Sequence, residues 1–141
     1  MLDWLSCTLV KAASALLCRM PPGAAVWLGQ QGGLLVGCLQ PKRTRIGLLN
    51  LRAAFDGTLT PGAARRIISA CYQQLGAGIV EMLRLPAIDR AYLDRYVAVE
   101  GRHHVEQAAG RPIIFLTGHY GNWELSSIAA ALHGYPIVAL A

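Results

Sequence analysis

The residues best suited to chemistry lie in one short polar segment, residues 118–124 (Gly-His-Tyr-Gly-Asn-Trp-Glu). It places His119 five residues before Glu124. A neutral histidine takes a proton from a hydroxyl near neutral pH, because its unperturbed pKa is about 6.5. A carboxylate on the other ring nitrogen fixes the tautomer and stabilises the imidazolium that forms. The segment therefore holds two parts of a proton-transfer triad, and the substrate would supply the hydroxyl.

The spacing lets the two side chains meet only if the histidine precedes the helix that carries the carboxylate. On one helix, residues five positions apart point about 140° away from each other. Gly118 and Gly121 give the backbone the freedom to fold back in a turn. Asn122 is a natural N-cap for the following helix. The amides at that helix start are also suited to a phosphate or a developing oxyanion.

The same residues have a second explanation that involves no catalysis. Glu124 in a first helical turn is favourable simply through the helix dipole. A lone histidine in a turn is commonly just a solvated turn residue. The residues by themselves leave both interpretations open.

The segments around this turn alternate as in a parallel α/β fold. Residues 112–117 (Pro-Ile-Ile-Phe-Leu-Thr) form a continuous apolar run, typical of a strand buried on both faces. Further strands are expected at residues 96–99 and 136–140, with helices at residues 102–109 and between Asn122 and Gly134. This order predicts parallel strands joined by crossover helices, with ligands bound beyond the carboxyl ends of the strands. Because the last expected strand runs to the end of the sequence, we interpret the chain as the first, truncated part of such a domain.

The first 40 residues are expected to form a membrane-associating helical hairpin. Leucines recur at helical spacing over residues 2–17 and predict an amphipathic helix that ends near Arg19. Residues 23–39 are apolar and uncharged, but their length is marginal for a span of about 20 residues. We expect the hairpin to lie in the membrane interface. One true span and two core helices of a soluble domain are the alternatives.

Composition and charge favour an anionic partner and a membrane. Hydrophobic residues make up 54% and charged residues 15% of the 141 residues, against about a quarter charged in typical proteins. The mean hydropathy is +0.38. The net charge of +5 suits an anionic membrane surface or an acidic carrier protein. No lysine-rich tail or basic-aromatic stretch supports a nucleic-acid partner. The basic residues 42–45 and Arg52 fit contact with headgroups on the cytoplasmic side, although a solvated helix face explains them too.

A long helix is expected between these parts of the chain. Thr60-Pro61 is typical of a helix start, and the helix should run to about Leu85, where Pro86 stops it. A short helix is expected near residues 89–95. Apolar residues line one stripe of the long helix at helical spacing: Ala64, Ile68, Cys71, Leu75, Ile79 and Met82.

The cysteines and the remaining histidines do not predict a metal site. The four cysteines show no Cys-x-x-Cys spacing and are interpreted as buried, reduced thiols. His103 and His104 are adjacent on an expected helix, so their side chains should point about 100° apart and not share one ion. His133 next to Gly134 fits a helix C-terminus. We expect no metal.

The run of residues 117–125 (Thr-Gly-His-Tyr-Gly-Asn-Trp-Glu-Leu) resembles the His-x4-Asp/Glu signature of glycerolipid-type acyltransferases. More narrowly, it resembles the His-aromatic-Gly-Asn-Trp-Glu form of the lipid A biosynthesis lauroyl/myristoyl acyltransferases. Upstream, residues 45–55 resemble that family's Arg-x4-Asn-Leu-x3-Phe segment, and residues 78–81 and 99–101 follow in the family's order. The resemblance covers roughly residues 15–141.

This resemblance implies an N-terminal hairpin, residues 1–40, followed by the N-terminal part of an α/β glycerolipid-acyltransferase-like catalytic domain, residues 41–141. His119 is then the general base and Glu124 its orienting partner. The supporting residues at the substrate site are Gly121, Asn122 and Trp123.

The function that the resemblance implies is transfer of a fatty acyl group to a hydroxyl of a membrane glycolipid such as a lipid A precursor. The donor is a thioester of acyl carrier protein or coenzyme A, and no other cofactor is implied. The reaction takes place at the cytoplasmic face of a bacterial inner membrane. The alternatives are a truncated, non-catalytic membrane-binding remnant and a hydrolase that uses the same histidine and glutamate with water.

Overall fold

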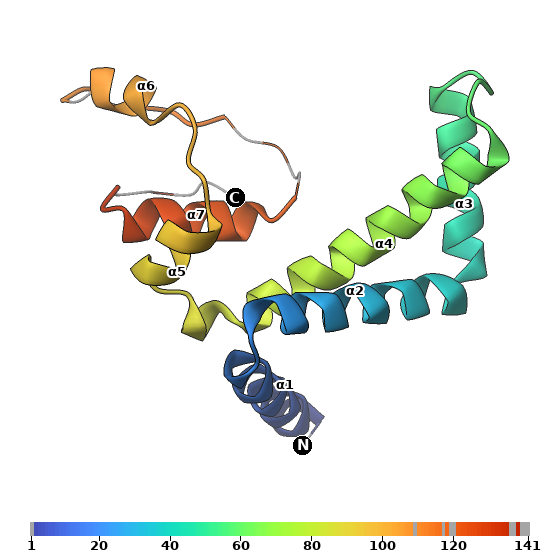
Figure 1. The fold of residues 1–141 in the computed structure, drawn as a ribbon, viewed down its shortest axis with the longest axis horizontal. Coiled ribbons are helices and arrows are strands. Elements are labelled where there is room, and N and C mark those ends of the chain that lie inside the picture. Colours follow the sequence, from blue (N-terminus) through green and yellow to red (C-terminus); the bar gives the residue numbers. More distant parts are fainter. Residues whose placement is uncertain (1, 109, 117, 119–120, 136–137, 139–141) are drawn as a thin grey trace. The chain divides into compact units, whose positions relative to one another are not determined.

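The structure, a computed structural model, describes residues 2–108, 110–116, 118, 121–135 and 138. All regular secondary structure in these residues is helical. The chain divides into two compact units, an N-terminal unit (Met1–Leu85) and a C-terminal unit (Pro86–Ala141). In Figure 1 the first runs from blue to yellow-green and the second from yellow to red.

The helices of the N-terminal unit are α1 (Leu2–Arg19), α2 (Pro22–Leu39), α3 (Pro41–Ala54) and α4 (Pro61–Leu83). Proline begins α2, α3 and α4, where its missing N–H costs no hydrogen bond and its fixed φ suits the helix. The hydroxyl of Thr60 accepts a hydrogen bond from the Ala63 amide at 3.2 Å and caps α4. The predicted helix that ends near Arg19 and the predicted long helix after Thr60 are both confirmed.

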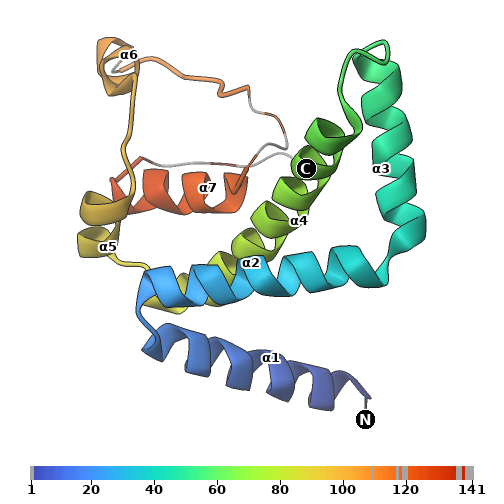
Figure 2. The same ribbon diagram turned by 45° about the vertical axis from the view of Figure 1, so that its right-hand side comes forward.

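The helix α4 runs obliquely across α2 (Figures 1 and 2), and their backbones meet through glycines. Gly29 and Gly33 of α2 and Gly76 of α4 are buried. A Cβ added to Gly29 would lie 2.6 Å from the carbonyl oxygen of Gly76, and one added to Gly33 would overlap the carbonyl oxygen of Tyr72. Since Gly37 also lies against the Tyr72 ring, the face that α2 turns to α4 consists largely of glycine.

A buried arginine ties the C-terminus of α1 to the end of α4. The Arg84 side chain is 4% exposed, and its guanidinium donates hydrogen bonds to the carbonyl oxygen of Leu17 and, at 2.8 Å, to that of Met20. Ser14 Oγ donates to the carbonyl oxygen of Leu83 at 2.5 Å. The last carbonyls of a helix have no intrahelical donor. Arg84 therefore gives the Leu17 carbonyl a second donor beside the Met20 amide, and it gives the Met20 carbonyl a charged donor just beyond the end of α1.

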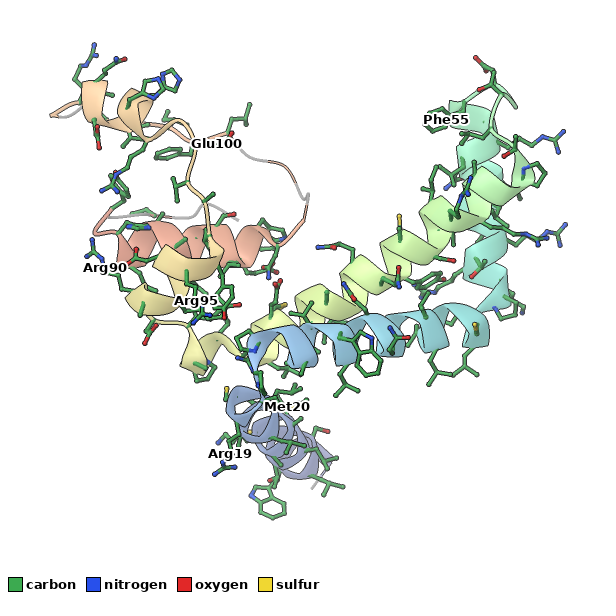
Figure 3. All side chains as sticks on the ribbon, in the orientation of Figure 1. Arg19, Met20, Phe55, Arg90, Arg95 and Glu100 are labelled. Carbon is green, nitrogen blue, oxygen red and sulfur yellow. The ribbon has the colours of Figure 1, made fainter. Side chains whose placement is uncertain are left out.

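The core of the N-terminal unit is small and lies at this junction. Leu17, Ala25 and Val80 are buried together, one from each of α1, α2 and α4. Met20, labelled in Figure 3, and Leu83 pack against them. This small core removes little apolar area from water. The close glycine contacts between α2 and α4 and the hydrogen bonds of Arg84 therefore also hold the helices together.

The C-terminal unit contains α5 (Arg90–Tyr96), α6 (Arg102–Gln107) and α7 (Trp123–Leu132), and a 3-10 helix (Leu85–Ala87) leads into it. Asp89 Oδ1 accepts a hydrogen bond from the Tyr92 amide at 2.8 Å and caps α5. Leu93 of α5 is completely buried. The short helices expected near residues 89–95, over residues 102–109 and after Asn122 are confirmed in type, with α6 ending earlier than expected.

The predicted α/β fold with its parallel, glycerolipid-acyltransferase-like sheet is wrong, because the described residues contain no strand. Tyr96 belongs to α5, and residues 97–100 and 112–116 are not paired. Ile114 is 95% and Leu116 99% exposed. An apolar run becomes a strand only when a neighbour supplies the hydrogen bonds of a ladder, and no described segment does so. Of the third expected strand, only Val138 is described.

The division of the chain at Leu85 follows its contacts. The division predicted at residue 40 separates a membrane-associating hairpin from a catalytic part, and it stays a prediction. Within the described part of the chain, no helix combines the length and the hydrophobicity that crossing a bilayer demands.

Candidate active site

The candidate site lies at the N-terminus of α7, in the C-terminal unit. Asn122 is the N-cap, and its side-chain oxygen accepts a hydrogen bond from the Leu125 amide at 3.0 Å. The Asn122 carbonyl also accepts from the Ser126 amide at 3.4 Å. The side chain thus satisfies one of the four amides that a helix start leaves without intrahelical partners. The capping role predicted for Asn122 is confirmed.

A glycine in the left-handed region precedes this cap. Gly121 has φ +63°. Residues with a side chain adopt such angles at a cost of roughly 1–2 kcal/mol, whereas glycine adopts them freely. The chain therefore changes direction at Gly121 immediately before α7 begins, as the glycine in the motif predicts.

Glu124 is the second residue of α7 and is half-buried. A carboxylate in the first turn is favoured by the positive end of the helix dipole, typically by about 0.3–1 kcal/mol. Trp123, the first residue of the helix, is 40% exposed, and its carbonyl accepts a hydrogen bond from Ser127 Oγ at 3.3 Å. Gly121, Asn122, Trp123 and Glu124 are thus brought together in one turn and one helix start.

His119, the predicted general base, lies outside the described residues, as do Thr117 and Tyr120. The pairing of its ring with the Glu124 carboxylate therefore stays a prediction. What the structure does provide is a carboxylate in the first turn of a capped helix, shortly after a glycine in the left-handed region.

The other histidines lie away from this turn in sequence. His133 is the C-cap residue of α7, and its amide donates to the Ala129 carbonyl at 2.9 Å, so the predicted helix-end position is confirmed. The rings of His103 and His104 have their centroids 3.9 Å apart, so the expectation that they diverge is wrong. Nonetheless, no group of three histidine, cysteine, aspartate or glutamate residues suited to a metal ion occurs among the described residues.

The cysteines are free, but they are not buried as predicted. Cys7, Cys38 and Cys71 are exposed and Cys18 is half-buried. Cys7 and Cys38 lie on α1 and α2, where many large apolar side chains are exposed. Apolar neighbours in the sequence therefore do not show that these cysteines are buried. Arg84, the buried charged side chain of the N-terminal unit, was not singled out from the sequence. The sequence did offer one indication that this side chain is buried, because Arg84 stands between Leu83 and Leu85.

Comparison with known families defines first the class and then the family of this protein. Residues 1–140 match the family model of the bacterial lipid A biosynthesis acyltransferases. The class is therefore that of acyltransferases acting in lipid A biosynthesis. The chain belongs to the bacterial lipid A biosynthesis acyltransferase family. Comparison with curated proteins and with solved structures gave no match. The family resemblance inferred from residues 117–125 and 45–55 is confirmed.

Proposed function

We propose that His119 and Glu124 are the catalytic pair of an acyltransferase that uses a thioester of acyl carrier protein or coenzyme A as donor. The acceptor is a hydroxyl of a membrane glycolipid such as a lipid A precursor, at the cytoplasmic face of the bacterial inner membrane. Family membership supports the reaction class. The observation that carries the residue assignment is the Asn122-capped start of α7, which holds the Glu124 carboxylate beside the Gly121 turn.

In the proposed reaction, a ring nitrogen of His119 takes the proton of the acceptor hydroxyl as the hydroxyl oxygen attacks the thioester carbonyl carbon. A carbon–oxygen bond forms and the carbonyl oxygen becomes an oxyanion. When the oxyanion collapses, the carbon–sulfur bond breaks and the thiolate takes the proton from the imidazolium. Glu124 accepts a hydrogen bond from the other ring nitrogen and stabilises the imidazolium. The substrate hydroxyl is the nucleophile, so no acyl-enzyme forms.

The other motif residues support this pair. Asn122 fixes where α7 begins, because its side chain caps the Leu125 amide. Gly121 adopts φ +63° directly before this cap, which glycine does without strain. Trp123 is 40% exposed at the same helix start, and in this proposal it forms part of the acceptor site.

The proposal is tested by transfer of a radiolabelled acyl group to a lipid A precursor, using the protein as its gene encodes it. His119→Ala removes the base, and the rate is expected to fall by a factor of about 10²–10⁴. Glu124→Gln keeps the shape but removes the charge that stabilises the imidazolium, so the rate also falls. The matched control is His104→Ala, which removes an exposed imidazole outside the motif and leaves the rate unchanged. Near-normal transfer by His119→Ala would show that the base is assigned wrongly, and release of free fatty acid by the unaltered protein would show a hydrolase.

A further inference from the structure

The positive charge of the chain is concentrated in residues 41–80, which include α3 and most of α4. These residues contain six lysines and arginines and a single acidic residue, Asp56. Their net charge of +5 equals that of the whole chain, because the rest of the chain carries as many acidic as basic residues. The first turns of α3 and α4 contain no acidic residue. This part of the protein therefore presents an excess of cations.

Three of these cations form what we call the arginine surface: Arg52 in the last turn of α3, and Arg65 and Arg66 early in α4. All three side chains are exposed, and none forms an ion pair with another residue that the structure describes. The helix positions three and four residues from Arg65 and Arg66 hold only proline, glycine, alanine, isoleucine and serine. The fold therefore gives these arginines no anionic partner of its own.

Contacts between α3 and α4 place the arginine surface at one end of this helix pair. Thr44 Oγ1 donates a hydrogen bond to the Tyr72 hydroxyl at 3.3 Å, and a Cβ added to Gly47 would lie 2.6 Å from Cδ1 of Ile68. Because the residue numbers rise along α3 as they fall along α4, the two helices are antiparallel. The last turn of α3 and the start of α4 therefore lie at the same end. Figures 1 and 2 show the helices meeting there, and Figure 3 labels Phe55 at this end.

The exposed surface beside these arginines is polar. Every residue from 56 to 74 is described, and none of the large apolar side chains among them is exposed. Ser69 and Gln74 are exposed instead. The helices α1 and α2, by contrast, expose several leucines. A polar, cationic surface binds a partner through charge pairs and hydrogen bonds, and it gains nothing from insertion among apolar chains.

We propose that the arginine surface docks the acidic protein body of the acyl carrier protein that donates the acyl group. This inference rests on the proposed function, and it names the carrier protein as the donor in preference to coenzyme A. Small ligands bind in concave sites that bury most of their surface, whereas all three arginines are exposed. Arginine pairs with carboxylates in a bidentate geometry, and complementary charge steers the encounter of two proteins. The charge of this surface has the sign that an acidic protein requires.

Docking is tested by the dissociation constant of the whole chain for purified acyl carrier protein. Arg65→Gln combined with Arg66→Gln is expected to raise this constant about tenfold, and Arg52→Gln should raise it further. The matched control, Arg90→Gln combined with Arg111→Gln, removes two exposed arginines of the C-terminal unit and leaves the constant unchanged. Equal weakening in the two pairs would assign the effect to net charge alone and overturn the docking surface. Unchanged binding in the α4 pair would overturn it as well.

The same variants separate docking from the chemical step. With the acyl carrier protein as donor, KM is expected to rise about tenfold in the Arg65→Gln, Arg66→Gln pair, while kcat stays the same. With acyl coenzyme A as donor, both constants should stay unchanged. An equal rise in KM for both donors would show that the arginines do not recognise the carrier, and it would overturn the proposal. If the unaltered chain transfers from neither donor, the proposed function fails, and the binding measurement still decides the docking surface.

Two further measurements distinguish docking from a structural role and from a lipid partner. Denaturant unfolding should give the same free energy of unfolding for the α4 pair and for the unaltered chain, since neither arginine has an internal ion pair. A clear loss of stability would assign the arginines to the fold and overturn docking. Flotation with phosphatidylglycerol vesicles should also be unchanged in the α4 pair. Loss of vesicle binding with carrier binding intact would assign the surface to lipid headgroups and refute the proposal.

Discussion

The carbonyl oxygen of Gly76 lies where a side chain on Gly29 would begin, 2.6 Å from the position of its Cβ. Neither helix tolerates a side chain at this contact, and the same holds for Gly33 against the Tyr72 carbonyl. Gly32, the residue before Gly33, is exposed, and a Cβ there would meet nothing within 4 Å. The two adjacent glycines of α2 thus differ only in whether they face α4.

This difference predicts opposite effects of the same substitution. Gly33→Ala forces α2 away from α4 and is expected to lower the free energy of unfolding by about 1–3 kcal/mol, as overpacking does. Gly32→Ala relieves the entropic cost of a mid-helix glycine and is expected to raise it by about 0.5–1 kcal/mol. Denaturant unfolding followed by circular dichroism measures the free energy of unfolding of both variants. If both alanines stabilise, the two helices do not touch at Gly33.

Arg84 predicts how firmly α1 is held. Arg84→Met keeps a long apolar stem but removes the donors to the carbonyls of Leu17 and Met20. Losing these hydrogen bonds from a charged donor is expected to cost about 1.5–3 kcal/mol. Hydrogen exchange of the α1 amides should then become faster than that of the α4 amides. Arg66→Met, an exposed arginine on α4, is the control, and equal exchange in the two variants would contradict the capping role.

Asn122 predicts a link between helix capping and activity. Asn122→Ala removes the acceptor for the Leu125 amide and is expected to destabilise α7 by about 0.5–2 kcal/mol. Asn122→Asp keeps a capping oxygen and should retain the stability of α7. If the cap serves the reaction by placing Glu124, acyl transfer should fall in the alanine variant and recover in the aspartate variant. Equal activity of all three proteins would separate the cap from the reaction.

The ends of several helices could be predicted from the sequence because local chemistry determines them. Thr60, Asp89 and Asn122 are short polar residues that cap their own helices, and each does so in the structure. Proline and glycine mark the other ends, with Gly134 at φ +85° after α7. A helix over residues 41–54 was foreseen only as the alternative to a headgroup-binding segment, although Pro41 begins it.

Features that depend on a distant partner could not be predicted. Residues 112–116 have the apolar character of a buried strand, but pairing needs a second segment that the local pattern does not specify. Leucine periodicity predicted α1 correctly, yet the period is the same whether the apolar stripe faces a core or lipid. Only Leu17 of that stripe is buried among its described residues. For the candidate site, the sequence predicted the cap and the turn, and the structure leaves the position of His119 as a prediction.

The unpaired segment around Ile114 and Leu116 has a consequence for handling the protein. Both side chains are almost fully open to solvent, next to the exposed ring of Phe115, and the short run contains no charge. Such segments are the ones through which separate molecules begin to stack into cross-β aggregates. At high concentration in plain aqueous buffer, we expect the protein to aggregate through this segment and the solution to become turbid. Leu116→Lys should delay the aggregation.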